Sequence, residues 1–135
     1  MSQKENIAIA QKLLASIGQG VEPDMIAALF HEDVAFEIPG DGGALPWIGR
    51  KRGREAVADF MRGLRSLTEA VRFDVQDIVA SEDRAVVVGE LATRIKATGT
   101  VIESPFAIIL TISEGKISRF QMLEDSFAVS RAARA

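Results

Sequence analysis

The glutamate at position 90 is the first residue of this sequence that could do acid–base chemistry. Glu90 interrupts the apolar run Val86–Ala92, in a segment whose composition predicts a strand. Apolar surroundings disfavour the charged form of a carboxyl group and raise its pKa towards the range that is useful for proton transfer. Glu90 is therefore a candidate catalytic residue. An ion pair with Arg94 and an exposed position at a sheet edge fit the same pattern.

Glu124 and Asp125 form a second acidic position, at the end of a predicted strand. Neighbouring residues of an extended strand point to opposite faces, so one of the two can reach a pocket. If Phe120, Met122 and Glu124 face the helices, Glu124 contacts the ligand and Asp125 faces outward. Asp125 is the second candidate catalytic residue, and the alternative is that it caps the turn that follows it.

Two side chains in irregular segments are candidates for ligand contacts. His31 follows a short predicted helix and could transfer protons near neutral pH, although a histidine there often binds the last carbonyl groups of the helix. Trp47 lies in the Gly- and Pro-rich segment 39–52 and could close over an apolar ligand. The alternative for Trp47 is an anchor that packs this loop on the next helix.

Three phenylalanines and one methionine complete the set of candidate binding residues. Aromatic side chains of predicted strands and helices belong to the core more often than to a ligand site. In a fold with a hollow interior, however, the core and the pocket wall share residues. We therefore include Phe36, Phe60, Phe106 and Met122 among the residues expected to line a pocket.

Composition excludes several classes of function. The 135 residues carry 16 basic and 19 acidic side chains, and this net charge of −3 is the wrong sign for a general nucleic-acid binder. The absence of cysteine excludes disulfides and thiolate metal sites, and a single histidine excludes a His-rich zinc site. We expect no metal and no cofactor.

The sequence shows no sign of membrane insertion or export. The longest apolar run, Phe106–Ile112, is far shorter than the about 18 residues that a membrane span needs. The first residues lack a basic segment followed by an apolar stretch, which is the pattern of a secretory signal. We therefore expect a cytoplasmic protein that does not bind membranes.

Local patterns predict helices first and strands afterwards. Ser2 and Glu5 have the spacing of a capping box, and Pro23 suits the first position of a second helix. Apolar residues at intervals of three and four predict a third helix over Arg54–Leu67. Alternating and β-branched residues predict strands at 34–38, around Phe73–Val75, and at 85–95, 101–112 and 117–123.

These elements predict an α+β domain in which helices cover one face of a curved, mainly antiparallel sheet. The runs Val86–Leu91 and Phe106–Ile112 are apolar at both odd and even positions, so both sheet faces should be covered. We expect a second copy of the chain to cover the open face and form a homodimer. The alternative is a C-terminal segment that folds back over it.

Five short segments together resemble the nuclear-transport-factor-2-like superfamily, and most of all its SnoaL-like branch. They are Leu29–Val34, Pro46–Gly49, Gly53–Phe60, Gly115–Phe120 and Leu123–Ser126. The resemblance covers nearly the whole chain and implies one domain over residues 1–135. It also implies a cone-shaped fold with about three N-terminal helices and a pocket between helices and sheet. This branch includes polyketide cyclases and is related to ketosteroid isomerases.

The resemblance carries over to particular positions with clear departures. The position of the isomerase general base resembles Ile38, and its tyrosine donor is missing because the chain contains no tyrosine. Asp125 resembles the acid–base aspartate of the SnoaL-like cyclases. The implied function is binding of a small hydrophobic molecule, with isomerase, cyclase or lyase chemistry that uses Asp125 or Glu90 as general base and no cofactor. The alternative is a binding or dimerisation module without catalysis.

Overall fold

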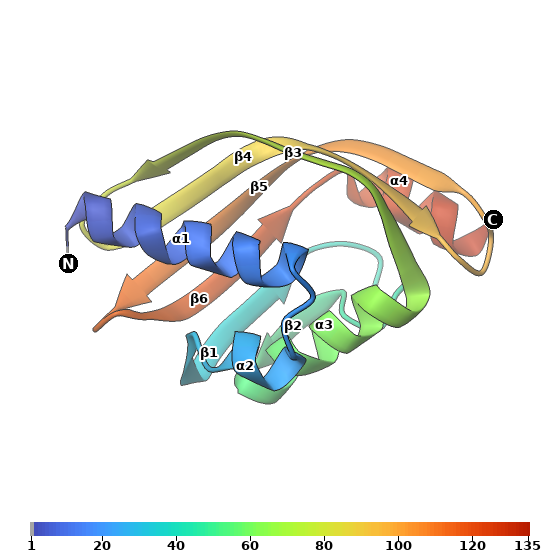
Figure 1. Ribbon diagram of the computed structural model, residues 1–135. Helices are drawn as coiled ribbons and strands as arrows, with labels where there is room; N and C mark the ends of the chain where they lie inside the picture. The colour runs from blue at the N-terminus through green and yellow to red at the C-terminus, as the bar shows by residue number, and fades with distance from the viewer. Residues whose placement is uncertain (1) are drawn as a thin grey trace.

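The computed structural model describes residues 2–135, which form a curved sheet with helices packed in its concave side (Figure 1). The helices are α1 (Gln3–Gly18), α2 (Pro23–Ala27), α3 (Arg54–Leu67) and α4 (Ser126–Arg134). The strands are β1 (Phe30–Ile38), β2 (Gly49–Arg52), β3 (Thr68–Ala80), β4 (Arg84–Ile95), β5 (Val101–Ser113) and β6 (Lys116–Leu123). The predicted α+β class is confirmed. None of these helices is long and apolar enough to cross a bilayer.

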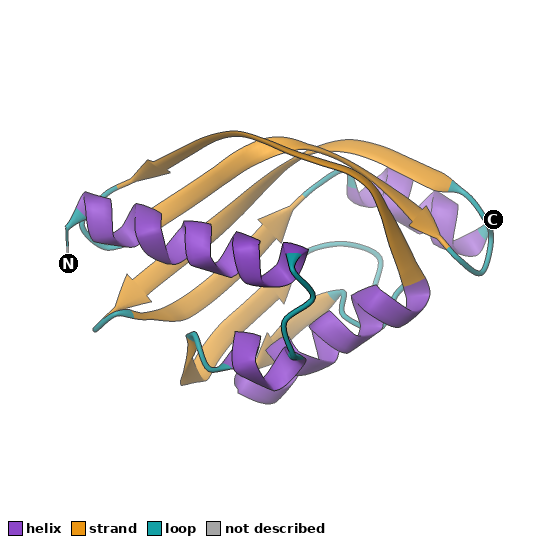
Figure 2. Ribbon diagram, in the orientation of Figure 1, coloured by secondary structure: helices purple, strands orange, loops and turns teal. Residues whose placement is uncertain are grey.

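The sheet has the order β2-β1-β6-β5-β4-β3, and all neighbours are antiparallel except β1 and β6, which run parallel. The three long strands β3, β4 and β5 arch over the helices (Figure 2). Register shifts in β3 interrupt its ladder with β4 between Ala70 and Arg72 and again between Val75 and Asp77. Bulges of this kind increase the local bend and twist of a strand, so they contribute to the concave shape.

Helix α1 begins with the predicted capping box. The Ser2 hydroxyl group accepts a hydrogen bond from the Glu5 backbone N–H, and the Glu5 carboxylate accepts one from the Ser2 N–H, both at 3.1 Å. One turn later, buried Asn6 donates through Nδ2 to the carbonyl oxygens of Ser81 and Glu82, both at 3.0 Å. These bonds tie the start of α1 to the β3–β4 turn.

The structure differs from the predicted elements at two strands. Strand β1 begins at Phe30 rather than at Val34, and residues Gly49–Arg52, which we expected to be loop, pair with β1 as an edge strand. The four residues of β2 carry no apolar side chain, so no alternating pattern marked them. Basic side chains are typical of an edge strand because they discourage pairing with other chains.

The C-terminal residues form a fourth helix that the sequence analysis missed. Val129 and Ala132 of α4 are buried. The Asp41 carboxylate accepts hydrogen bonds from the Ser130 hydroxyl group at 2.6 Å and from Arg134 at 2.7 Å. Thr98 in the β4–β5 turn donates to the Ala132 carbonyl oxygen at 2.8 Å. Helix α4 is therefore fixed to one end of the sheet (Figure 1).

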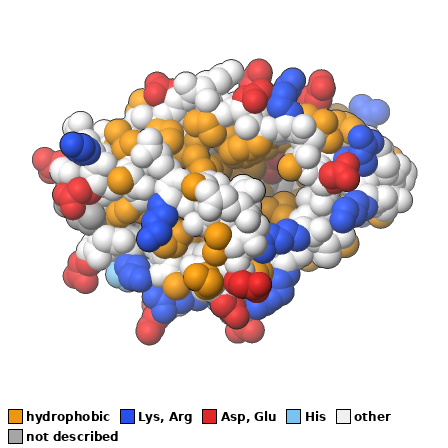
Figure 3. All heavy atoms as spheres, viewed as in Figure 1, with side chains coloured by type: hydrophobic (Ala, Val, Ile, Leu, Met, Phe, Trp, Pro, Cys, Tyr) orange, Lys and Arg blue, Asp and Glu red, His pale blue; other side chains and the backbone are white. Residues whose placement is uncertain are grey.

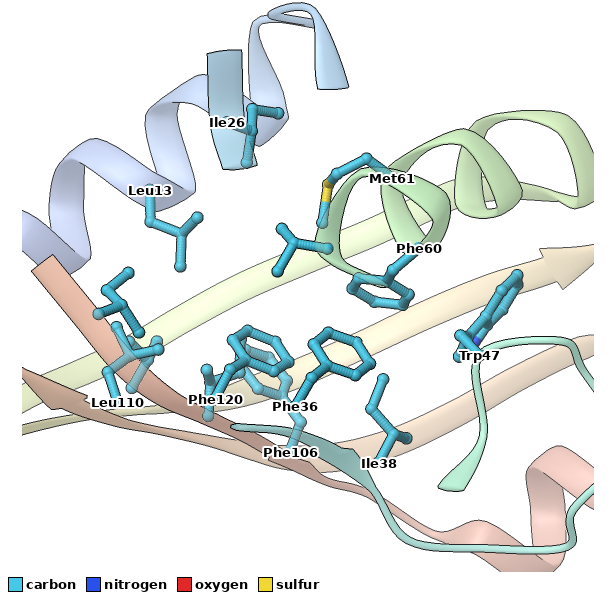
Figure 4. Packing of buried hydrophobic residues seen from close by; sticks show 14 of the residues in the cluster. Leu13, Ile26, Phe36, Ile38, Trp47, Phe60, Met61, Phe106, Leu110 and Phe120 are labelled. Atoms are coloured by element: carbon cyan, nitrogen blue, oxygen red, sulfur yellow. The ribbon is translucent and has the colours of Figure 1, made fainter. Parts of the chain in front are cut away.

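The core lies between the helices and the inner face of the sheet (Figure 4). Phe36 and Phe120 stack with ring centroids 5.1 Å apart, and Phe60 of α3 packs against both rings. All three side chains are at most 5% exposed. They close the part of the interior beneath β1 and β6, so any open space must lie elsewhere.

The outer face of the sheet is apolar at its centre and open to water. Val86, Val88, Ala107 and Ile109 lie on this face and are partly exposed, while their neighbours on each strand point into the core. The sequence analysis expected this face to be covered, and within the single chain these side chains stay partly exposed. Helices α1, α2 and α3 all lie on the other side of the sheet (Figure 1).

Replacing Gly89 with alanine should destabilise the protein. A Cβ atom at this position on the inner face would overlap the Asp74 carbonyl group and lie 3.0 Å from the Phe106 ring. We expect Gly89→Ala to cost about 1–3 kcal/mol of unfolding free energy, measured by urea denaturation. Gly18→Ala is the control, because its added Cβ meets no atom within 4 Å beyond the neighbouring residues and backbone of its own helix. Equal stability of the two variants would contradict the crowding at Gly89.

Candidate functional site

A hollow opens between the sheet and the helices. Figure 3 shows it in the face that Figure 1 presents, with hydrophobic side chains around it. Phe73 and Val75 of β3 pair with the buried residues Leu91 and Gly89, so they lie on the inner face, yet they are 44% and 41% exposed. Leu67, at the end of α3, is 38% exposed. Apolar side chains on the concave side are thus left uncovered.

Phe73 and Phe106 form the aromatic part of this inner surface. Their rings stack with centroids 4.7 Å apart, and Phe106 is only 4% exposed. Gly89 pairs with Phe106 in the β4–β5 ladder, and its missing side chain leaves the space that the Phe106 ring occupies. Phe106, which was expected to line a pocket, therefore lies on the inner face almost completely covered by its neighbours, and the more exposed Phe73 lies beside it.

Glu124 follows directly on the last residue of β6 and lies on the inner face. Phe120 and Met122 of β6 pack against the core, and Leu123 between Met122 and Glu124 is 41% exposed. The alternation continues into Glu124, whose side chain is largely removed from water, and ends with the exposed Asp125. Of the two arrangements that the sequence left open, the structure shows the one with Glu124 inside.

The carboxyl group of Glu124 has lost water without gaining a partner. Among residues 2–135 no side chain or backbone N–H donates a hydrogen bond to it, and no Lys or Arg forms an ion pair with it. Burial alone raises the pKa of Glu124 from 4.5 to about 7. Among residues 2–135, Asn6 Oδ1 is the only fully buried side-chain N or O atom that lacks a hydrogen-bond partner. The Glu124 oxygens also lack a partner, so they are not fully buried, and a bound molecule could reach them.

A carboxyl group in this state can both accept and donate a proton near neutral pH. General acid–base catalysis is most effective when the pKa of the group is close to the working pH, because both protonation states are then populated. A group on an apolar inner surface also meets an apolar substrate without competition from bulk water. The geometry and the electrostatics of Glu124 together favour proton transfer to or from a ligand atom.

Asp125 caps a helix and does not face the interior. It is the N-cap residue of α4, and its carboxylate accepts a hydrogen bond from the Ala128 backbone N–H at 3.0 Å. The side chain is exposed. The structure thus places Asp125 outside the hollow, in the capping role that was the alternative to catalysis.

Glu90 lies on the outer face of the sheet, where it is exposed. The expectation of a buried carboxyl group at this position is wrong. In the β4–β5 ladder Glu90 pairs with Pro105, and the inner face passes instead through its neighbours Gly89 and Leu91. The sequence did not reveal this placement, because Val86 and Val88 on the outer face are apolar like the inner-face residues that alternate with them.

His31 lies at the opposite end of β1 and β6 from Glu124. Its Nε2 atom is 2.9 Å from the carbonyl oxygen of Ser113, the last residue of β5, and not at the end of α2. His31 lines an open cleft of about 580 Å³ together with charged residues that include Arg54, Glu114 and Lys116. The structure does not bring His31 together with the other candidates.

Trp47, Phe36 and Phe60 belong to the closed part of the core. Trp47 is 6% exposed and packs edge-on against Phe60 with centroids 5.6 Å apart (Figure 4). A Cβ atom at Gly63 of α3 would lie only 2.9 Å from the indole ring, so the ring rests directly on the helix. Trp47 is thus the loop anchor that was the alternative to a ligand contact.

The structure contains no metal-binding cluster in residues 2–135, since no three or more His, Asp or Glu side chains are placed to hold an ion. Ser104 is the polar residue nearest in sequence to Phe106 on the inner face of β5, and it is 4% exposed. The sequence analysis did not single it out. A serine before a proline in an otherwise apolar strand was the signal available.

Comparison with known proteins matches this arrangement to one family. The model of the SnoaL-like domain matches residues 11–120. None of the curated proteins matches the chain. Among solved structures, an NTF2-like protein from Burkholderia xenovorans LB400 is similar with 28% identity and a TM-score of 0.88, over 98% of each chain.

Two less similar structures share the fold. A proposed SnoaL-like polyketide cyclase from Mesorhizobium loti matches with 19% identity and a TM-score of 0.70, over 87% of this chain and 97% of that one. A Catenulispora acidiphila protein with a ketosteroid isomerase-like fold, solved with trimethylamine, matches with 19% identity and a TM-score of 0.73, over 93% and 92%.

Replacing Glu124 with glutamine should change the pH dependence of stability. The unfolded chain ionises this group near pH 4.5, whereas the folded protein holds it neutral to about pH 7. The raised pKa therefore costs nothing below pH 4.5, and its cost grows to its full value above pH 7. We expect Glu124→Gln to stabilise the protein by roughly 1–3 kcal/mol more at pH 8 than at pH 4, measured by urea denaturation.

Glu82→Gln is the matched control, because Glu82 is exposed in the β3–β4 turn, away from both sheet faces. Its effect on stability should be small at both pH values. A Glu124→Gln effect that is equal at pH 4 and pH 8 would show that the carboxyl group is hydrated in the folded protein.

Proposed function

Because the chain belongs to the SnoaL-like domain family, we propose that it binds a small, largely apolar molecule in the hollow and uses Glu124 to move a proton on it. The observation that carries the proposal is the desolvated carboxyl group of Glu124, without a partner on the inner face of the sheet. The apolar surface of Phe73, Phe106 and Met122 favours a hydrophobic ligand.

The chemistry that fits one such carboxyl group is enolisation of a carbonyl compound. The ionised Glu124 removes a proton from the carbon next to the carbonyl group, and the electron pair of that C–H bond moves towards the carbonyl oxygen. The protonated Glu124 then returns the proton to the same carbon or to another one. Return to another carbon through a conjugated double bond gives an isomerisation. Attack of the enolate carbon on a second carbonyl group of the same molecule, whose oxygen then takes the proton from Glu124, gives a cyclisation. A positioned base contributes a factor of about 10²–10⁴.

The relatives support this class of activity in general terms. One structure of the same fold is described as a proposed polyketide cyclase, and another holds trimethylamine, a small organic molecule. We therefore assign the proton-transfer role to Glu124, which was expected to contact the ligand, in place of Asp125 and Glu90. The SnoaL-like fold hosts both enzymes and binding proteins, so residue chemistry must decide between them.

Two observations favour a second function, binding without catalysis. Ile38, at the position that resembles the isomerase base, is 2% exposed within the core. With no tyrosine in the chain, no phenol can stabilise an enolate oxygen. In this alternative Glu124 would serve to orient or retain a ligand.

Proton exchange on small ketones tests the catalytic proposal. We would incubate the protein with a panel of cyclic and aryl ketones in D₂O and follow loss of the proton next to the carbonyl group by NMR. We expect the native chain to accelerate exchange on at least one ketone, and Glu124→Gln to lose about 10²–10⁴-fold of that rate.

Glu90→Gln should keep the native rate, since Glu90 lies outside the hollow. Unchanged exchange in Glu124→Gln would reject Glu124 as the base. Ketones that bind the native protein, as seen by NMR line broadening, but never exchange would favour the binding function instead.

We also propose that a second copy of the chain covers the outer face of the sheet. The apolar centre of this face, which contains Val88 and Ile109, gives such a partner a surface to bury. A homodimer buries the same patch on both subunits, so each copy must complement itself.

The charges on the outer face fit this self-complementary arrangement. On one side Arg50 and Arg119 share a single carboxylate, that of Glu37, at 2.7 and 3.8 Å. On the other side Glu90 and Glu103 are diagonal neighbours across β4 and β5, and within residues 2–135 neither forms an ion pair. Opposite charges on separate parts of the outer face allow a two-fold arrangement in which the basic part of one copy meets the acidic part of the other.

Charge insertion at the centre of the outer face tests the dimer. We expect the native chain to sediment as a dimer in analytical ultracentrifugation and Val88→Lys to sediment as a folded monomer. Val71→Lys is the control, since Val71 is 51% exposed at a register shift of β3 away from this centre. A monomeric native chain, or a dimer that survives Val88→Lys, would reject this interface.

A further inference from the structure

Ser104 is a buried polar residue on the apolar inner face of the sheet. It lies in β5 between Ile102 and Phe106, which alternate with it on the same face, and it is 4% exposed. A hydroxyl group that leaves water costs free energy unless it finds hydrogen-bond partners. The hydrogen bonds of Ser104 therefore indicate why a polar residue is found at this position.

The hydroxyl group of Ser104 uses its proton and a lone pair on two fixed partners. It donates to the Pro105 carbonyl oxygen at 2.6 Å and accepts a hydrogen bond from the Asp125 backbone N–H at 2.8 Å. The first bond orients the hydroxyl group so that its oxygen faces Asp125. The second bond connects β5 to the residue that directly follows Glu124.

The hydrogen bond between Ser104 and the Asp125 N–H lies beyond the last backbone pairing of β5 with β6. The last paired residues at this end are Ala107 and Leu123. Pro105, two residues before Ala107 in β5, has no N–H group to donate to a neighbouring strand. The side chain of Ser104 thus holds the main chain at Asp125, beyond the point where backbone pairing does so.

Asp125 fixes the chain in the other direction as well. Its carboxylate caps α4 through the Ala128 N–H, and α4 is held in turn by the bonds of Ser130 and Arg134 to Asp41. Glu124 therefore lies between the end of a strand and an anchored helix start. Its own side chain makes no hydrogen bond with any residue from 2 to 135, so its direction depends on the conformation of its main chain.

We propose that Ser104 is a positioning residue of this site, which keeps the Glu124 carboxyl group on the inner face of the sheet by holding the Asp125 main chain. This inference rests on the proposed role of Glu124. Glu124 is free of partners on the inner face, and water stabilises its charged form. The main chain must therefore prevent the carboxyl group from turning outward.

Carboxyl titration of Glu124 by ¹³C NMR measures this positioning without any ligand. In the native chain we expect a titration midpoint near pH 7. Ser104→Ala removes the acceptor, and the midpoint should fall by about one unit or more towards 4.5 as water reaches the carboxyl group. Ser104→Thr keeps a hydroxyl group and should restore the native midpoint. Ser118→Ala, which loses a serine bond to Thr111 at the far end of β6, should leave it unchanged.

A pair of substitutions at Asp125 separates the backbone bond from the helix cap. Asp125→Ala removes the capping carboxylate but keeps the N–H group. Asp125→Pro removes both, and the φ of −70° at this position is one that proline adopts. We expect the Glu124 midpoint to fall further in Asp125→Pro than in Asp125→Ala, although both variants lose the cap.

The outcomes distinguish this inference from the proposed function. A native midpoint near 4.5 would overturn the role of Glu124 and the positioning role with it. A raised native midpoint that is unchanged in Ser104→Ala would overturn the positioning role alone and leave the proposed function standing. If Asp125→Pro does not fold, judged by circular dichroism, the comparison of Ser104→Ala with Ser104→Thr still decides.

Discussion

Removing a carboxyl group from water is the physical cost that the proposed site depends on. Within residues 2–135 no cation is paired with Glu124 and no hydrogen bond reaches its carboxyl group, so burial raises its pKa to about 7. Such a group turns towards solvent unless the fold prevents it. The strand alternation of β6, the Ser104 bond and the capped start of α4 restrict the main chain on both sides of Glu124.

The hollow itself depends on how unevenly the interior is packed. Beneath β1 and β6, the rings of Phe36, Phe60 and Phe120 fill the space against α3. Beneath β3, the inner face retains exposed apolar side chains such as Phe73. The long strands arch over the helices, with bulges in β3, and the same sheet closes a core at one edge and leaves an apolar surface at the other.

Elements whose signals are local were predicted well. The capping box of α1 and the full extent of α3 depend on contacts between residues three or four apart, and these spacings are present in the sequence. Strand β2 and helix α4 were missed because their partners are distant. The polar residues of β2 form a strand by pairing with β1, and α4 is held by Asp41 and Thr98, far away along the chain.

The sequence alone determined the α+β class, the family resemblance, and that Glu124 and Asp125 must face opposite sides of an extended chain. Tertiary structure decided which of the two faces the helices, and it placed Glu90 outside. The physical reason is that the alternation of side chains along a strand separates residues into two faces but does not identify which face is the inner one. In β4 and β5 both faces are apolar, so only the cross-strand register and the side on which the helices pack distinguish them.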